Sequence, residues 1–352
     1  MGFIENTSLI AFNVKLVHQY KKIILGANMN RTLLVKVLFL SCFTLLPIFQ
    51  NAYSQTSYPT KSVKIIVPFG AGGTGDILAR IFGQYLEGQT KQSVFIENKP
   101  GASGILGTEA AKNAEPDGYT LLLSTNTTHA ANVSLFKKLP YDPVKDFVNI
   151  ASFGYVSMVG TIPPDSPFNS INSLVTYSNN NPGKVFYGFY NSASLMSAEQ
   201  LKSRSGANLT GVSYKTIGNA ITDLMGGQIQ LLFLETASGG SFVESKKILP
   251  IGVTSLQRYK KWPNVPAIAE TYPGFELTAY LALSAPAKTP PDIVNALNQW
   301  ANKSLSDPTV KTKFDNLGIH SQNMTLEEMK KYVQSEIDRW ITYTKNAGIE
   351  PQ

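Results

Sequence analysis

The chain has 352 residues, 43% of them hydrophobic, and a formal net charge of +7 from 31 Lys and Arg against 24 Asp and Glu. Its single cysteine excludes an internal disulfide and a cysteine zinc site. A basic balance of this size could indicate a nucleic-acid or membrane partner, so the position of the charge along the chain decides its meaning.

The first 54 residues have the pattern of an export signal. Arg31 and Lys36 precede a short apolar run, and Ala52-Tyr53-Ser54 suits cleavage before Gln55. The apolar run is too short to favour a membrane span. We therefore expect residues 1–54 to be removed and the mature protein to be periplasmic.

The predicted signal carries much of the basic character. Five of the Lys and Arg and one Glu lie in it, which leaves about 298 residues with a net charge of +3. A nucleic-acid partner is not expected at that charge. Cys42 leaves with the signal, and the two remaining histidines are too few for a zinc cluster. Met29 is the more natural start for such a signal, and whether Cys42 is lipidated stays open.

The stretch Ile65 to Arg80, IIVPFGAGGTGDILAR, organises the rest of the chain. An apolar strand at 63–67 breaks at Pro68, crosses a glycine loop and enters an amphipathic helix near Thr74, which could serve as N-cap. A glycine loop that opens a helix exposes unpaired N–H groups at the positive end of the helix dipole. The stretch therefore predicts an anion site.

The same loop leaves the identity of the anion open. Gly70 to Gly75 matches the dinucleotide pattern G-x-G-x-x-G, and Glu97 follows 22 residues after Gly75, where such a fold places its ribose-binding acid. A site for NAD and a site for a carboxylate both fit this window.

The elements after the glycine loop alternate as in an α/β fold. Apolar runs predict strands at 94–96 and 120–123, with a helix at 105–112 between them. Such alternation implies a parallel sheet with right-handed crossovers. Ligands in open α/β sheets lie beyond the carboxyl ends of the strands. We therefore expect Asn126 and Thr127 to face the glycine loop, although helix capping would equally explain the threonines there.

A second lobe is expected, because the mature chain exceeds the size at which single cores tend to split. An extended segment at 147–162 leads into it. The predicted strands are 185–188, near 212, 230–234 and 249–253, and the predicted helices are 170–179, 195–205, 219–225 and 240–244. The strand ends carry Phe189 to Ser192, Tyr214 to Thr216, and Glu235, each a ligand contact or an ordinary turn.

The chain then returns to the first lobe. A segment rich in proline and glycine at 254–276 precedes a strand at 277–285 and helices at 292–305, 308–317 and 326–346. The expected domains are lobe 1, residues 55–155 with 275–352, and lobe 2, residues 156–274. His129 is expected to be a structural hydrogen-bonding residue, since no partner nucleophile accompanies it.

Several runs resemble the Bug-type solute-binding proteins, the extracytoplasmic receptors of tripartite tricarboxylate transporters. The resemblance covers nearly the whole mature chain in order. Its motifs include Ile66-Val67-Pro68-Phe69, Glu97-Asn98-Lys99-Pro100-Gly101-Ala102, Pro116-Asp117-Gly118-Tyr119, Asp223-Leu224-Met225-Gly226-Gly227-Gln228 and Pro273-Gly274-Phe275-Glu276.

The resemblance implies a two-lobed periplasmic-binding fold of α/β class, type II-like. Each lobe would be a mainly parallel sheet flanked by helices, with the ligand cleft between the lobes. It also implies a monomer that captures a small organic carboxylate and delivers it to the membrane permease subunits of such a transporter. No catalytic residue, cofactor or metal is expected.

In the resembling family, the loop after the first strand holds a ligand carboxylate through backbone amides. Asp76 would repel that carboxylate, so it is expected to orient water, cap the turn or meet an amino or hydroxyl group. Carried over, the loop residues are Phe69, Ala71, Gly72, Gly73, Thr74 and Asp76. The strand-end residues expected to contact the ligand are Asn126, Thr127, Tyr190, Asn191, Ser192, Thr216 and Glu235.

Two departures leave the ligand class open. The second-lobe loop after Tyr187 lacks the usual histidine, and Ser213, Thr216 and Ile217 replace the usual proline and glycines around Tyr-Lys. The alternative function is an NAD-dependent oxidoreductase that uses the Gly70–Gly75 loop. An exported hydrolase is disfavoured, because the chain has no G-x-S-x-G elbow.

Overall fold

The computed structural model describes residues 58–352, which form one unit by their contacts. The predicted signal at 1–54, the alternative start at Met29 and Cys42 lie outside the described residues. Within residues 58–352, every helix is too short or too polar to span a bilayer.

The first sheet contains the glycine-loop strand. β1 (Val63–Val67) lies between β2 (Val94–Asn98) and β3 (Thr120–Thr125) and is parallel to both. β3 also pairs antiparallel with β9 (Thr278–Pro286), and β9 pairs antiparallel with β4 (Phe147–Ile162). The order is therefore β2-β1-β3-β9-β4, and the carboxyl ends of the three parallel strands meet at one edge.

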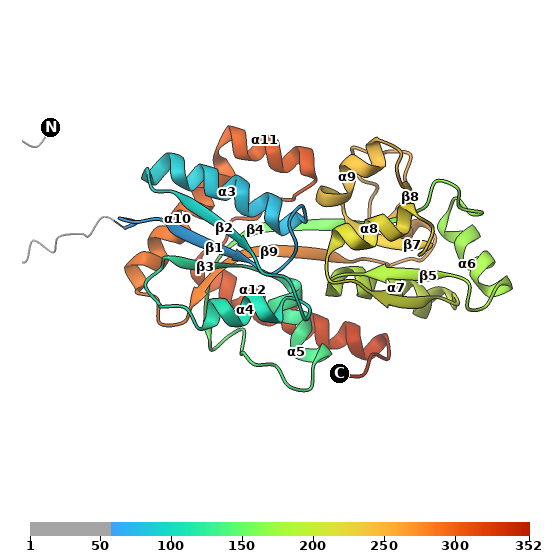
Figure 1. Cartoon of the computed structure of the whole chain (residues 1–352), viewed down its shortest axis with the longest axis horizontal. Helices are drawn as coiled ribbons and strands as arrows, with labels where there is room; N and C mark the ends of the chain where they lie inside the picture. The colour runs from blue at the N-terminus through green and yellow to red at the C-terminus, as the bar shows by residue number, and fades with distance from the viewer. Residues whose placement is uncertain (1–57) are drawn as a thin grey trace, which may run out of the picture. The chain divides into compact units, whose positions relative to one another are not determined.

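The second sheet begins where β4 changes partners. Residues 147–157 of β4 pair with β9, whereas residues 158–162 pair antiparallel with β7 (Leu231–Glu235) and β8 (Leu249–Val253). β5 and β7 are parallel, and β5 also pairs with β6 in parallel. β5 covers Phe186–Phe189 and β6 covers Thr210–Ser213. β4 and β9 run between the two groups of elements (Figure 1).

Helices flank both sheets (Figure 1). On the first sheet they are α3 (Thr74–Thr90), α4 (Ile105–Lys112), α5 (Asn132–Leu135), α10 (Pro291–Ser306), α11 (Pro308–Leu317) and α12 (Leu326–Asn346). On the second they are α6 (Ile171–Asn180), α7 (Ser192–Ser205), α8 (Ile217–Met225) and α9 (Thr236–Glu244). Two short turns complete the fold: a π-helical turn, η2 (Thr127–Ala131), and a 3₁₀ turn, η3 (Ile268–Glu270).

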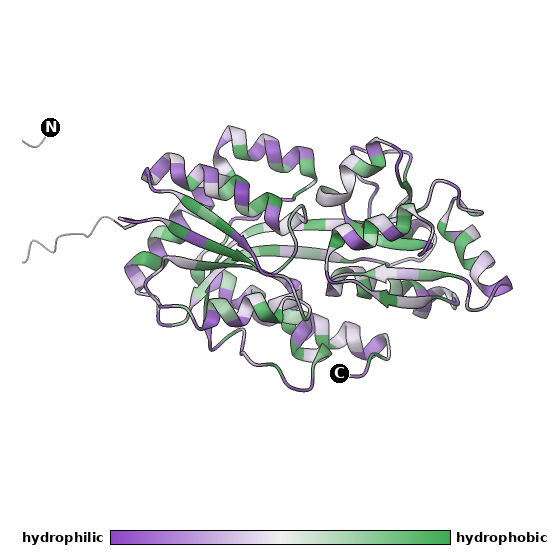
Figure 2. Ribbon diagram, viewed as in Figure 1, coloured by the Kyte–Doolittle hydropathy of each residue, from purple (hydrophilic) through white to green (hydrophobic). Residues whose placement is uncertain are grey.

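The apolar stripes of the sequence become the core. In α3, Leu78, Phe82 and Leu86 are buried at helical spacing, and the Phe82 ring lies 4.9 Å from that of Phe153 on β4. A fully buried side chain of this size contributes about 1.5–3 kcal/mol. Figure 2 shows mostly hydrophobic strands and largely hydrophilic outer helix faces. The core therefore fixes the direction from which α3 meets the glycine loop.

The predicted α/β architecture with two groups of parallel strands is confirmed, and its strands and most helices lie where they were expected. Two helix starts differ by three or more residues. α7 begins at Ser192, because the Asn191 side chain accepts a hydrogen bond from Ser194 N at 2.9 Å and caps the helix. α9 begins at Thr236. α3 begins at Thr74 as predicted, but its N-cap residue is Gly73 and not Thr74. The lobe boundaries at 155/156 and 274/275 stay predictions.

Candidate functional site

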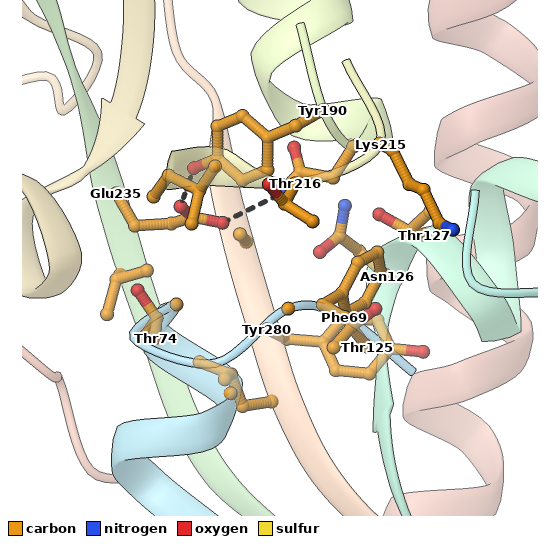
Figure 3. A pocket seen from close by; sticks show the side chains of 18 residues that line it. Phe69, Thr74, Thr125, Asn126, Thr127, Tyr190, Lys215, Thr216, Glu235 and Tyr280 are labelled. Atoms are coloured by element: carbon orange, nitrogen blue, oxygen red, sulfur yellow. Dashed lines mark hydrogen bonds between the residues drawn. The ribbon is translucent and has the colours of Figure 1, made fainter. Parts of the chain in front are cut away.

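A cavity of about 30 Å³ lies where loops of both sheets meet (Figure 3). By this measure it has room for about two water molecules. It receives residues from the glycine loop, from the end of β3, from β4 and β9, and from strand ends of the second sheet. Its wall consists of Phe69, Gly70, Gly73, Thr74, Gly75, Thr125, Asn126, Thr127, Val156, Tyr190, Asn191, Lys215, Thr216, Ile217, Glu235, Ala279, Tyr280 and Leu281.

The amino-terminal end of α3 forms one part of this wall. Its N-cap residue, Gly73, offers no side-chain hydrogen bond, so the first N–H groups of the helix have no partner from a cap. The dipole of this 17-residue helix adds partial positive charge there. A Cβ on Gly70 would lie 3.2 Å from Thr216 Cβ, which shows how closely the loop approaches the second sheet. The wall can therefore donate main-chain hydrogen bonds to an anion.

Two threonine hydroxyl groups on the wall lack hydrogen-bond partners among the described residues, and so does the hydroxyl group of the wall residue Tyr280. Thr74 Oγ1 and Thr125 Oγ1 are buried, and neither has a hydrogen-bond partner within residues 58–352. Buried polar side chains in native proteins are almost always hydrogen-bonded, to protein or to water, because an unpaired one costs about 1–3 kcal/mol. These two hydroxyls are therefore available to a polar group inside the cavity.

Lys215 provides the positive charge of the wall. It is the cationic residue among the lining side chains, it is exposed, and it makes no ion pair with any residue in the range 58–352. The sequence predicts a strand end at Tyr214 to Thr216 and a ligand contact at Thr216, but it does not single out Lys215. The structure brings both to the wall.

Glu235 provides the negative charge of the wall. Its Oε1 accepts a hydrogen bond from Asn191 Nδ2 at 2.7 Å, and its Oε2 accepts one from the Tyr190 hydroxyl. Burial and the neighbouring Glu235 carboxylate raise the pKa of Tyr190 well above its usual value, so the hydroxyl stays protonated and donates. The three predicted residues Tyr190, Asn191 and Glu235 thus form one hydrogen-bonded group.

Side chains of the two sheets also bond directly beside the cavity. Ser192 Oγ lies 3.1 Å from Asn126 Nδ2 and 2.8 Å from Thr127 Oγ1, and Ser192 N donates to Thr127 Oγ1 at 3.3 Å. Ser192 therefore joins α7 to η2. Of these three predicted residues, Asn126 and Thr127 line the cavity and Ser192 does not.

Three predicted loop residues lie off the wall. Ala71 and Gly72 are exposed, and Gly72 N donates to Asp76 Oδ2 at 3.0 Å. Arg80 forms an ion pair with Asp76 at 2.9 Å. Burial acts to raise the pKa of Asp76, but the hydrogen bonds from Arg80 and Gly72 outweigh it and lower the pKa. The Asp76 carboxylate is thus engaged within its own loop, and Phe69, Gly73 and Thr74 are the predicted loop residues on the wall.

Residues of the long strands were missed by sequence reasoning. Val156 on β4 and Leu281 on β9 line the cavity, together with Ala279 and Tyr280. These strands are almost entirely buried apolar runs, so nothing in their composition marks the few residues at the wall. Ile217 was named only as a departure from the family pattern.

The interpretation of the glycine loop as an NAD site depends on Glu97 as the residue that would bind the ribose. This carboxylate lies on β2, is not part of the cavity wall, and forms ion pairs with Lys64 at 3.2 Å and Lys99 at 3.8 Å. Both pairs are half-exposed and contribute little to stability. Within residues 58–352, no three His, Cys, Asp or Glu side chains are grouped to hold a metal ion.

His129 lies in η2 and is not one of the residues that line the cavity. It is fully buried, its Nδ1 lies 3.0 Å from Thr128 Oγ1, and its ring is 4.9 Å from that of Phe147. Burial lowers the pKa of His129 to about 3. The imidazole is therefore neutral in the folded protein at neutral pH, in keeping with the expected structural role.

This burial predicts a pH dependence of stability. Below about pH 6.5, His129 is protonated in the unfolded chain. In the folded protein it stays neutral down to about pH 3. The free energy of unfolding should therefore fall as the pH decreases from 6.5, by up to about 1.4 kcal/mol per pH unit. Urea unfolding between pH 7.5 and 5 measures it. His129→Gln should be less stable at pH 7.5 but have a flatter dependence, and equal slopes for the two proteins would contradict the assignment.

The fold and the site define a class of protein. Two α/β groups of elements share long antiparallel strands, and a cavity lies at the carboxyl ends of their parallel strands, as in periplasmic solute-binding proteins. The chain belongs to the tripartite tricarboxylate transporter family receptor group, whose family model matches residues 78–349. The expected Bug-type resemblance is confirmed.

Individual relatives agree with this membership. Protein BugT of Bordetella pertussis is 29% identical over 327 residues, 92% of this chain and 99% of that protein. The solved structure of R. palustris Rpa4515 with adipate has a TM-score of 0.82 at 30% identity and covers 84% of this chain and 100% of that chain. MatC (Rpa3494) from Rhodopseudomonas palustris with bound malate has a TM-score of 0.77 at 28% identity, with 81% and 99% covered.

The family is one of solute-binding receptors of the periplasm, a class without catalytic activity. The first function expected from the sequence, solute binding, is therefore confirmed at the level of the family. The oxidoreductase alternative has no support from these relatives.

Proposed function

We propose that this protein captures a small organic carboxylate in the cavity and delivers it to the permease subunits of a tripartite tricarboxylate-type transporter. The observation that carries the proposal is that the uncapped amino-terminal end of α3 and the cationic Lys215 both lie on the wall of one cavity. Two relatives with the same fold were solved with adipate and malate, both small carboxylates. Their binding supports the chemical class but not a particular ligand.

In this proposal the ligand carboxylate accepts hydrogen bonds from the first N–H groups of α3 and from Lys215. Thr74, Thr125 and Thr127 supply hydroxyl groups next to it. A small organic acid is larger than the two water molecules that fit the cavity, so lobe 1 and lobe 2 must separate to admit it and close again on it. The bonds of Ser192 to Asn126 and Thr127 join the lobes in the closed arrangement.

The role of a solute receptor also determines the proposed oligomeric state, location and partners. The proposed receptor acts as a monomer in the periplasm after removal of residues 1–54. It takes no cofactor and performs no reaction, and its partners are the permease subunits and the ligand. Saturable binding of NAD without binding of any carboxylate would favour the oxidoreductase alternative.

Lys215→Met tests the role of the cation. Hydrogen bonds to charged groups contribute about 1.5–3 kcal/mol, and Lys215 is exposed, so we expect the affinity for the best carboxylate to fall by about tenfold. A thermal-shift screen of dicarboxylates, tricarboxylates, aromatic acids and amino acids identifies that compound, and isothermal titration calorimetry measures its dissociation constant. The matched control is Lys184→Met, which changes an exposed lysine in the turn before β5 and off the wall, and should bind as the wild type does. A screen without any bound carboxylate would refute the proposal.

A further inference from the structure

Lys215 and Glu235 are the charged side chains on the cavity wall. Figure 3 shows them on opposite sides of the pocket, with Glu235 beside Tyr190 and Lys215 beyond Asn126. They do not form an ion pair with each other. The cavity is therefore polarised, with a cation at one side and a carboxylate at the other.

Glu235 is a buried side chain at the start of a helix. It is the N-cap residue of α9, where the helix dipole stabilises a negative charge, yet its side chain makes no capping hydrogen bond. The side chain lies instead on the cavity wall, and the residue is only 7% exposed. No Lys, Arg or His within residues 58–352 forms an ion pair with it.

The hydrogen bonds of Glu235 come from neutral groups only. Asn191 Nδ2 donates to one oxygen, the Tyr190 hydroxyl donates to the other, and Ser238 Oγ lies 3.4 Å from that second oxygen. An ionised carboxylate can accept about four hydrogen bonds, so at least one acceptor position is left. A buried carboxylate without a counter-charge is costly unless a cation compensates it, and Glu235 lines the cavity from which such a cation could reach it.

We propose that the ligand carries a protonated amino group, which Glu235 receives, while its carboxylate meets Lys215 and the amino-terminal end of α3. This inference rests on the proposed function and narrows its substrate class to amino-acid-like zwitterions. A ligand with a second carboxylate at the Glu235 side would place two negative charges together, and a neutral group there would leave the Glu235 charge uncompensated.

Matched compounds test the proposal. 2-Aminoadipate is compared with adipate, and aspartate with succinate and with its hydroxyl analogue, malate. Isothermal titration calorimetry on the mature protein should show that the preferred amino compound binds more tightly than its partner without nitrogen by about tenfold or more. Glu235→Gln keeps the size of the side chain and removes its charge, so this preference should fall to near one.

The control is Glu244→Gln, the same change at the last residue of α9. Glu244 is exposed and pairs with Lys261 away from the cavity, so the preference for the amino compound should stay as in the wild type. If Glu235 only held Tyr190 and Asn191 in place, Glu235→Gln would weaken amino and non-amino ligands equally. That result would overturn the inference.

The outcomes separate this inference from the proposed function. Binding of adipate, succinate or malate as tightly as their amino analogues by the wild type would overturn the inference and leave the proposed function standing. Binding of no carboxylate of either kind would overturn both. If Glu235→Gln fails to fold, as judged by circular dichroism, the comparison of compounds on the wild-type protein still decides.

Discussion

Replacing Gly73 by valine should abolish ligand binding and leave the fold intact. Gly73 has φ −73° and ψ 164°, extended values that valine adopts readily. A Cβ at this position would meet Gly70 O at 3.4 Å and Ile217 Cγ2 at 4.0 Å, both ordinary contacts. The two methyl groups, however, would enter a cavity of about 30 Å³ and cover the first N–H groups of α3.

We expect the affinity for the preferred carboxylate to fall by at least about 100-fold, since a charge-assisted hydrogen bond alone contributes about 1.5–3 kcal/mol. Titration calorimetry measures the affinity, and a melting curve followed by circular dichroism verifies the fold. Gly88→Val is the matched control, because Gly88 lies on the same helix and its Cβ would have no atom within 4 Å. Unchanged affinity in Gly73→Val would remove the role assigned to the α3 amino terminus.

The parts of the fold that depend on local sequence patterns could be predicted, and the pairing of distant strands could not. The apolar stripe of α3 and the alternation of strands and helices are visible in the chain, because helical and strand spacing differ. The pairing of β4 with β9 could not be predicted, since it joins segments more than a hundred residues apart and both strands are buried apolar runs. The change of partners within β4 has no signature for the same reason.

The candidate site was predictable where topology brings polar side chains together. Asn126, Thr127, Tyr190 and Glu235 follow strands whose carboxyl ends converge, and all four lie on the cavity wall. A predicted site residue can lie off the wall when its side chain bonds to a neighbouring residue instead. Asp76 bonds to a residue of its own helix four positions on, a spacing that already favours such a pair.

The neighbouring positions Asn191 and Ser192 show a further limit of sequence reasoning. Both were expected in a loop after a strand. Asn191 instead caps α7, and this places Ser192 in the first turn of the helix, from which it reaches η2 across the cavity edge. A shift of three residues in a helix start thus changes a residue from a predicted ligand contact to one that joins the two sheets.

The largest expected loss of stability follows from Gly154 in β4. Its φ is +121°, a value that residues with a side chain rarely adopt, and a Cβ would lie 2.0 Å from the backbone oxygen of His320. Two main-chain hydrogen bonds hold the segment at His320 against β4 there. Tyr155 N donates to His320 O at 3.1 Å, and His320 N donates to Tyr155 O at 2.8 Å. An added methyl group must push this backbone away, because no flexible side chain can yield instead.

Gly154→Ala should therefore lower the free energy of unfolding by about 3–5 kcal/mol, the sum of backbone strain and two weakened hydrogen bonds. Urea unfolding at neutral pH measures it. Gly183→Ala is the control, because Gly183 also has a positive φ, +73°, but a Cβ there would meet no atom within 4 Å. The control should lose only about 1–2 kcal/mol, the conformational cost by itself. Equal losses in the two variants would show that the bridge between His320 and Tyr155 contributes nothing to stability.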